Sequence, residues 1–240
     1  MQPVFSAFLD VLFPPLCLGC GARVSVEEFL CPRCLCDCVP LPLTREQSLG
    51  HLASLATSCD ATMMLVGWEY EHDGVIGRCI HAVKYRRLHR AGLWLGALLG
   101  ERLVSESMTA SRTILEGDAV LLPVPLHRLK RIERGYNQAE FLCRGIAAEC
   151  GIAWDTLLLS RRRYTTSQSA AKLDQDERQR NVRDAFSVDQ RRAAELRGRP
   201  LILVDDLVTT GATISACVDV LVAAGFTDVR ILAVARPPRH

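Results

Sequence analysis

The stretch LILVDDLVTTGAT, residues 201–213, restricts the fold of this chain more than any other feature. Four apolar residues lead into two adjacent acids, Asp205 and Asp206, and a turn of threonines and glycine then opens a segment with helical spacing. A buried strand that runs directly into a helix is typical of a parallel α/β sheet, in which ligands bind beyond the carboxyl ends of the strands. The two acids therefore lie where such a sheet would bind a ligand.

The rest of the chain alternates in the same way between short apolar runs and segments of helical periodicity. Strands are predicted at residues 64–70, 118–126, 200–207 and 228–236, and helices at residues 75–83, 91–104, 137–150 and 212–224. A small segment at residues 1–45 and a larger α/β domain at residues 60–240 are the predicted domains, and residues 41–58 are expected to be a loose connector between them.

The residue types around the two acids fit a sugar phosphate. Two carboxylates can accept hydrogen bonds from a vicinal diol such as that of ribose. The free N–H groups and the positive dipole end of the following helix favour a phosphate. A plain strand-to-helix turn with a threonine N-cap is the alternative, but it leaves the two neighbouring like charges unexplained. The candidate ligand residues are Asp205, Asp206, Thr209, Thr210, Gly211, Ala212 and Thr213.

Cysteines concentrate near the start of the chain, where six of the eleven lie between Cys17 and Cys38. CLGC and CPRC form two C-x2-C pairs with ten residues between them, which is the spacing of a four-thiolate zinc site. Gly19 and Gly21 permit tight turns there. The predicted metal ligands are Cys17, Cys20, Cys31 and Cys34, which would hold a structural zinc ion. Cys36 and Cys38 are expected to pack as small apolar side chains, although metal binding by them stays open.

Charge and hydropathy exclude several classes of protein. The net charge of +2 provides no general attraction to nucleic acid or to an anionic membrane. No stretch approaches the roughly 18 apolar residues of a membrane span. The first residues lack a basic region and are interpreted as a short amphipathic helix rather than a signal peptide. A cytoplasmic protein with reduced thiols is therefore expected.

Several motifs, taken in order, resemble the ComF family, a branch of the type I phosphoribosyltransferase-like proteins that is linked to DNA uptake and competence. They are the paired CxxC, VKY at 83–85, PVPLHRLKRIERGYNQAE at 123–140, RNVRDAF at 180–186 and the acid–threonine–glycine loop. The resemblance implies a parallel-sheet phosphoribosyltransferase-like fold with a small N-terminal zinc-binding segment. It also implies binding of PRPP or another phosphoribosyl ligand, with Mg²⁺ carried mainly by the PRPP oxygens.

The same resemblance assigns roles to individual residues. Asp205 and Asp206 would contact the ribose hydroxyls and would be the catalytic pair of an enzyme, while 209–213 would hold the 5-phosphate. The pyrophosphate would lie near the basic loop that begins at 123, and its candidate ligands are Lys84, Arg128 and Arg134. The alternatives are a solvated basic face for the two arginines and a helix-dipole cation for Lys84. Residues 161–186 would form a mobile lid, with Arg180 and Asn181 as its ligand contacts.

Two functions of different classes remain open at this stage. One is a PRPP-binding accessory protein in DNA uptake, which would act beside a competence helicase and a recombination mediator. The other is an active phosphoribosyltransferase of nucleotide salvage, for which no base-specific segment is recognisable after the phosphate loop. Weak binding of single-stranded DNA by Arg23, Arg33 and Phe29 of the cysteine segment is a subsidiary expectation.

Overall fold

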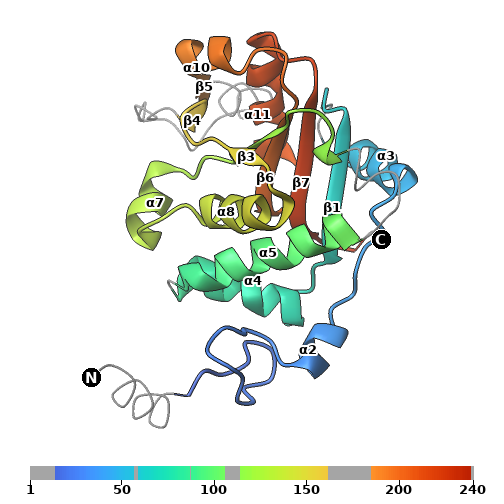
Figure 1. Ribbon diagram of the computed structural model, residues 1–240, viewed down its shortest axis with the longest axis vertical. Coiled ribbons are helices and arrows are strands. Elements are labelled where there is room, and N and C mark those ends of the chain that lie inside the picture. The colour runs from blue at the N-terminus through green and yellow to red at the C-terminus, as the bar shows by residue number, and fades with distance from the viewer. Residues whose placement is uncertain (1–13, 57–58, 87, 106–113, 162–184, 239–240) are drawn as a thin grey trace, which may run out of the picture.

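A parallel β-sheet covered by helices on both faces forms the body of the molecule (Figure 1). The computed structural model describes residues 14–56, 59–86, 88–105, 114–161 and 185–238. The described strands are β1 (Met63–Glu69), β2 (Val120–Pro123), β3 (Ala153–Trp154), β4 (Leu159–Arg161), β5 (Phe186–Val188), β6 (Leu201–Leu207) and β7 (Val229–Arg236). The described helices are α2 (Pro32–Cys36), α3 (Arg45–Ala53), α4 (Val75–Tyr85), α5 (His89–Ser105), α7 (Arg128–Arg134), α8 (Gln138–Cys150), α10 (Gln190–Glu195) and α11 (Ala212–Ala223).

The main sheet has the strand order β1-β7-β6-β2-β3, and each neighbouring pair is parallel. Pro123 lies opposite Val204 and Leu207 lies opposite Ala235, so β2, β6 and β7 end close together at the carboxyl edge. A separate antiparallel hairpin joins β4 to β5. The predicted α/β class with a parallel sheet is confirmed.

Alternate residues of each central strand face two different apolar layers. Leu65, Ile202 and Leu232 pack with α4, α5 and α8 on one face. Met64, Leu203 and Ile231 pack with α11 and the β4–β5 hairpin on the other. Strands buried on both faces are continuously apolar in sequence, which explains why the runs before Asp205 and after Asp228 predicted strands so clearly.

Local signals in the sequence set the ends of the helices beside the site. The Asn137 side chain accepts a hydrogen bond from the Ala139 N–H at the start of α8, and Gly151 ends that helix with a φ of 66°. Gly211 begins α11 with a φ of 82°, a conformation that glycine adopts at little cost. These boundaries were predicted from the sequence within a residue or two.

The expectation of a loose connector at residues 41–58 was wrong. Thr44 caps α3 by accepting a hydrogen bond from the Gln47 N–H, and the Ser48 hydroxyl of this helix accepts one from the Met64 N–H of β1. Leu52 and Leu55 pack against the α11 layer. The α3 segment therefore packs on the sheet through a few buried contacts. Its apolar periodicity is too weak for these contacts to be predicted from the sequence.

Six further elements of the described part were not predicted, namely β3, β4, β5, α2, α7 and α10. Each has seven residues or fewer, and none shows a continuous apolar run or a visible helical period. The predicted helix at the very start of the chain lies in residues 1–13, outside the described part. Within the described ranges, no helix is both long and apolar enough to cross a membrane.

The cysteine segment packs directly on the α4–α5 side of the sheet. Cys17, Leu30 and Cys34 belong to the same apolar layer as the helices, and the Phe29 ring lies 5.9 Å from the Trp94 ring. The division into residues 1–45 and 60–240 remains a prediction, but in the described part the two regions share one core.

Helices α5 and α8 approach each other so closely that glycine is required at their contact. A Cβ atom built on Gly145 would lie 2.1 Å from the Leu93 carbonyl oxygen, whereas one on Gly92 would meet side chains at 3.2 Å and beyond. We expect Gly145→Ala to lower the free energy of unfolding by about 1–3 kcal/mol, because backbone must move apart. Gly92→Ala is the matched control and should be close to neutral. Urea denaturation followed by circular dichroism measures both, and equal stabilities would contradict the packing.

Candidate functional site at the carboxyl edge of the sheet

Asp205 and Asp206 occupy the carboxyl end of β6, where the sequence placed them. Successive side chains of a strand point to opposite faces of its sheet, so the two carboxyls leave β6 in different directions. Asp206 lies on the α4 side and Asp205 on the α11 side, where its charge raises the pKa of Cys217, although burial contributes more to that rise. This divergence partly relieves the repulsion between adjacent like charges.

Lys84 neutralises one of the two acids. Its Nζ lies 2.9 Å from Asp206 Oδ1, and the two side chains are 17% and 6% exposed. The second carboxylate oxygen of Asp206 is buried and has no hydrogen-bond partner among the described residues. The pair ties the last turn of α4 to the end of β6 and leaves an acceptor available at the site.

Asp205 has no ion pair among the described residues, and its pKa is higher than that of an ordinary carboxyl group. Burial and, after it, the negative charge of Asp206 raise the pKa of Asp205 from 3.8 to about 7. The Asp206 N–H, which donates to Asp205 Oδ1 at 2.9 Å, offsets only part of this rise, as do the more distant charges of Lys84 and Arg134. Asp205 is therefore a carboxyl group that exchanges its proton near neutral pH.

The loop after β6 has the exposure that a phosphate ligand needs. Thr209, Thr210 and Ala212 are exposed, Thr213 is half-buried, and Gly211 is buried between them. A Cβ atom on Gly211 would lie 2.5 Å from Leu55 Cδ2, and the Thr210 carbonyl accepts a hydrogen bond from the Ala56 N–H. The α3 segment thus holds the back of the loop, while Thr209 and Thr210 are exposed and the Ala212 N–H donates a hydrogen bond to Thr210 Oγ1 at 3.5 Å.

Arg134 joins the acidic end of β6 to the aromatic side of α4. It is buried, donates a hydrogen bond to Gln138 Oε1 at 3.1 Å, and stacks with its guanidinium 5.2 Å from the Tyr85 ring centre. Its charge also lowers the pKa of Asp205. Of the predicted pyrophosphate ligands, Lys84 and Arg134 are therefore brought to the two acids.

Arg128 lies in a different hollow on the β2 side of the edge. This hollow has a volume of about 270 Å³, and Pro123, Arg131, Asn137, Thr156 and Arg161 are among the residues that line it. The Val124 N–H donates to the Val204 carbonyl, so the loop that leads to Arg128 begins beside β6. Thr156 was not singled out from the sequence, because it follows the undetected strand β3, whereas Arg161 is the first residue of the range predicted as a lid.

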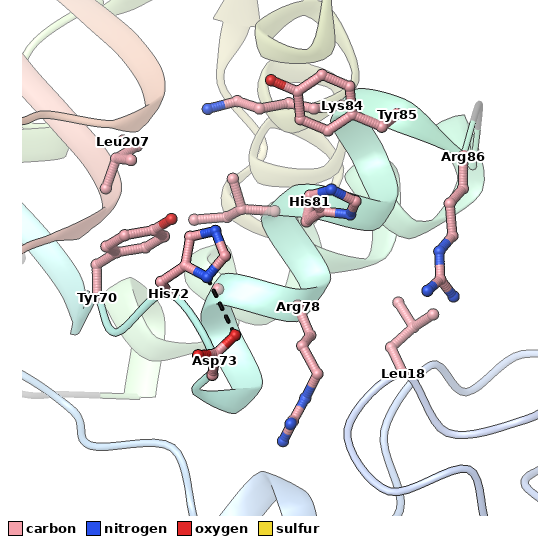
Figure 2. Close-up of a pocket in the computed structure, with 12 residues that line it drawn as sticks. Leu18, Tyr70, His72, Asp73, Arg78, His81, Lys84, Tyr85, Arg86 and Leu207 are labelled. Carbon is pink, nitrogen blue, oxygen red and sulfur yellow. Dashed lines mark hydrogen bonds and ion pairs between the residues drawn. The ribbon is translucent and has the colours of Figure 1, made fainter.

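A larger hollow of about 480 Å³ opens on the α4 side of the same edge (Figure 2). Lys84 of the ion pair lines it, together with Leu207 at the end of β6 and Tyr70 just beyond β1. His81 and Tyr85 add two rings from α4, with their centres 4.7 Å apart. Tyr70 and His81 were missed as site residues. The spacing of exposed residues on α4 was the available signal.

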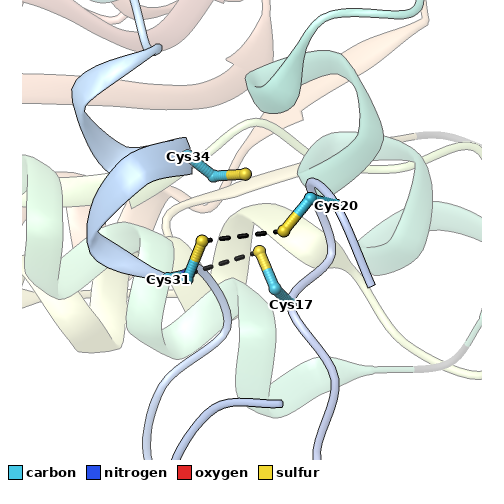
Figure 3. Close-up of side chains that lie close together, drawn as sticks. All are labelled: Cys17, Cys20, Cys31 and Cys34. Carbon is cyan, nitrogen blue, oxygen red and sulfur yellow. Dashed lines mark hydrogen bonds between the residues drawn. The ribbon is translucent and has the colours of Figure 1, made fainter. Parts of the chain in front are cut away.

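The four predicted metal ligands converge in one cluster of the cysteine segment (Figure 3). The Sγ atoms of Cys17, Cys20, Cys31 and Cys34 all lie within 4.8 Å of one another and could hold a metal ion. Cys36 and Cys38 lie outside this cluster, and the Cys38 thiol donates to the Cys34 carbonyl instead. A Cβ atom on Gly19 would lie 2.6 Å from Cys34 Sγ, so glycine is needed for the sulfurs to meet.

The thiols of the cluster differ in proton affinity. Although burial raises the pKa of Cys17, hydrogen bonds from the amides of Cys31, Cys20 and Gly19 bring it down to about 6. Burial raises the pKa of Cys34 instead. Amides that stabilise a thiolate are the setting in which a cationic metal is favoured. Arg180 and Asn181, the predicted lid contacts, lie outside the described residues.

These features define an α/β domain with a five-stranded parallel sheet and a four-cysteine cluster near its N-terminal end. No family profile matches the chain. It is 28% identical over 224 residues to the DNA utilization protein YhgH of Salmonella typhimurium, which covers 92% of this chain and 84% of that protein. It is 25% identical over 225 residues to the YhgH protein of Escherichia coli K12, again over 92% of this chain and over 90% of the relative.

A third relative carries the name competence protein F. This protein, from Haemophilus influenzae, is 29% identical over 144 residues, or 60% of this chain and 62% of its own length. One solved structure, that of the allosteric regulatory enzyme of purine biosynthesis, aligns with 58% of this chain at a TM-score of 0.36 and 23% identity. The chain spans 25% of that enzyme. The names of these relatives confirm the resemblance to the ComF family that the motifs indicated.

The two acids should have opposite effects on stability. Between its unfolded and folded pKa values, of 3.8 and about 7, Asp205 binds a proton only in the folded state, so the fold loses stability as the pH rises through this window. Asp205→Asn should raise the free energy of unfolding at about pH 8 by on the order of 2 kcal/mol, and the gain should shrink toward about pH 5. Urea unfolding at a series of pH values measures this.

Asp206→Asn is the matched comparison. It leaves the half-buried Lys84 ammonium without its carboxylate and should destabilise the protein by roughly 3 kcal/mol at about pH 8. The same sign for both variants at that pH would contradict the different roles of the two acids.

Proposed function

We propose that this protein binds a phosphoribosyl ligand, PRPP in the first instance, across the carboxyl edge of its sheet. The observation that carries the proposal is the arrangement at the end of β6. There an unpaired carboxyl with a pKa of about 7 stands next to a lysine-paired one, directly before exposed threonines at the start of α11. Acceptors for the ribose hydroxyls and donors for a 5-phosphate are thereby presented within eight residues of chain.

The pyrophosphate of PRPP fits the basic side of the edge. Arg134 lies over the Tyr85 ring, near enough for its charge to lower the pKa of Asp205, and Arg128 lies in the hollow beyond β2, so a ligand that reaches from α11 toward β2 would meet both charges. Mg²⁺ would bind mainly through ligand oxygens and would neutralise part of the pyrophosphate charge. Asp205 and the free oxygen of Asp206 are the protein acceptors that fit such a complex.

We infer further that the protein serves DNA uptake or DNA utilisation, as an accessory factor with a phosphoribosyl ligand. The names of its relatives, DNA utilization protein and competence protein F, support this role. A competence helicase and a recombination mediator are the proposed partners in the cytoplasm. Single-stranded DNA binding by the cysteine segment, through Arg23, Arg33 and Phe29, is a weaker additional proposal.

A second candidate function, catalysis, is favoured by the hollow beside Lys84. In a phosphoribosyl transfer, an acceptor nitrogen donates its electron pair to form a bond to ribose C1. The C1–O bond breaks, and pyrophosphate leaves with the two electrons of that C1–O bond. Asp205 and Asp206 would stabilise the oxocarbenium-like charge. The sequence offered no aromatic platform after the phosphate loop, but Tyr70, His81 and Tyr85 come from earlier segments and line the same edge.

Calorimetry with Mg²⁺-PRPP tests the binding proposal. The wild type should bind, and Asp205→Asn/Asp206→Asn should lose at least about tenfold in affinity, because the ribose acceptors become amides. Asp60→Asn removes an exposed acid elsewhere and should leave the affinity unchanged. Absence of heat with the wild type would overturn the proposal. Pyrophosphate release with a panel of bases and amines then separates the enzyme from the accessory protein.

We also propose that the four-cysteine cluster holds a structural zinc ion. Four thiolates at a Zn–S distance of about 2.3 Å lie about 3.8 Å apart in a tetrahedron. The Cys20 and Cys31 sulfurs are 3.6 Å apart. The closed set of four ligands leaves no position for a substrate, so the ion would contribute to folding, on the order of 10 kcal/mol in small zinc domains.

Measurement of the zinc content of the purified protein tests this proposal. The purified wild type should contain one zinc per chain, and Cys17→Ser should contain little and unfold at a lower temperature, because one thiolate ligand is gone. Cys36→Ser changes an exposed cysteine outside the cluster and should retain the ion. Loss of zinc from both variants, or from neither, would rule out the four proposed ligands.

A further inference from the structure

The hollow on the α4 side of the sheet edge is larger than the phosphoribosyl proposal requires. Its volume of about 480 Å³ lies in the range of pockets that hold small organic ligands, roughly 300–1,000 Å³. It opens at the carboxyl ends of β1 and β6, marked by Tyr70 and Leu207 in Figure 2. Leu18, from between two of the clustered cysteines, forms part of the opposite wall.

The lining of this hollow combines rings with positive charge. Tyr70, His72, His81 and Tyr85 supply planar groups, and Tyr85 is held in place between His81 at 4.7 Å and the Arg134 guanidinium at 5.2 Å. Aromatic and imidazole faces attract planar ligands, which stack on them in offset or tilted arrangements. A flat ring is therefore the shape that this lining fits best.

Charge decides the second property of the ligand. Arg78 and Arg86 project from α4 toward the hollow, and neither forms an ion pair with any acid of the described residues (Figure 2). Asp73 is the acid in the lining, and it is hydrogen-bonded to His72 at 3.0 Å. Lys84 adds a third cation, already paired with Asp206. The unmatched positive charge of the two arginines favours an anionic group on the ligand.

We propose that this hollow binds a planar nitrogen-containing ring that carries a carboxylate, next to the phosphoribosyl ligand. The ring would lie against His81 and Tyr85, and its carboxylate would meet Arg78 or Arg86. Lys84 connects this ligand to the sugar site, because it lines the hollow and its Nζ contacts Asp206 at 2.9 Å. The inference rests on the proposed phosphoribosyl binding only for the identity of the neighbouring ligand.

Matched probes separate ring shape from charge. Nicotinate and orotate carry a carboxylate, whereas nicotinamide and uracil are their neutral counterparts. Ligand-detected NMR and calorimetry with the full-length protein should show binding of the two acids, at least about tenfold weaker binding of the neutral rings, and tighter binding of the acids when Mg²⁺-PRPP is present. Equal binding of acids and neutral rings, or binding of none, would overturn the proposal.

Two variants test the location. Arg78→Gln/Arg86→Gln should lose at least about tenfold in affinity for the acids and keep the wild-type affinity for Mg²⁺-PRPP. Arg90→Gln removes an exposed arginine from α5, outside the lining, and should change neither. His81→Leu removes a ring without removing the arginines and should weaken all four probes together. Unchanged binding of the acids by the double arginine variant would show that they bind elsewhere.

The same measurements distinguish failure of this inference from failure of the phosphoribosyl proposal. If Mg²⁺-PRPP does not bind but the acids still bind in an Arg78- and Arg86-dependent way, the proposal for the hollow is supported and the proposed phosphoribosyl binding is contradicted. If Mg²⁺-PRPP binds and the acids do not, the hollow has another role. Oligothymidine that binds through Arg78 and Arg86, in place of the acids, would replace the small ligand with single-stranded DNA and overturn the proposal.

Discussion

The ion pair between Lys84 and Asp206 is the contact on which the arrangement of the site depends. Two adjacent acids at the end of a buried strand repel each other and lose solvation. The structure stabilises the two carboxyl groups in different ways. Asp206 is neutralised at 2.9 Å by a lysine from α4, whereas Asp205 stays unpaired with its pKa raised to about 7. Because the lysine comes from the last turn of α4, the pair also fixes that helix against the sheet edge.

Close helix contacts put α4 and α5 in the position that the pair requires. Glycines at the α5–α8 crossing let the backbones meet, and a Cβ on Gly96 would lie 2.3 Å from the Leu142 carbonyl oxygen. The cysteine segment then packs below α4 through Leu30 and the Phe29–Trp94 contact. The cysteine segment, a helix and the end of a strand thus share one apolar layer. This layer supports both the acid pair and the hollow beside it.

The threonine-glycine loop after β6, residues 209–213, is supported from the opposite face. Leu55 of the α3 segment covers Gly211, and the Ala56 N–H holds the Thr210 carbonyl. The exposed hydroxyls of the loop are therefore backed by a rigid wall. The two faces of the sheet contribute different parts of the site, with exposed threonines on the α11 side and cations and rings on the α4 side.

Much of this protein could be predicted from the sequence because the relevant physics is local. A strand buried on both faces must be continuously apolar, a helix start needs Gly or a capping residue, and two CxxC pairs with short spacing bring four sulfurs together. Strands β1, β2, β6 and β7, the Gly211 turn and the cysteine cluster were accordingly predicted. Strands β3, β4 and β5 and helices α2, α7 and α10 were not, because these short segments have neither a continuous apolar run nor a visible helical period.

The sequence by itself determined the class of the fold, the place of the two acids at a strand end and the identity of the clustered cysteines, since each follows from residue type and spacing along the chain. Only the tertiary structure decided which cation meets which acid. It also decided that Arg134 contacts Tyr85 while Arg128 lies beyond β2. Finally, it brought Tyr70, His81 and Leu18 together around one hollow. These contacts join segments far apart in the chain. Distances of that kind are set by how the helices pack on the sheet, which no local pattern records.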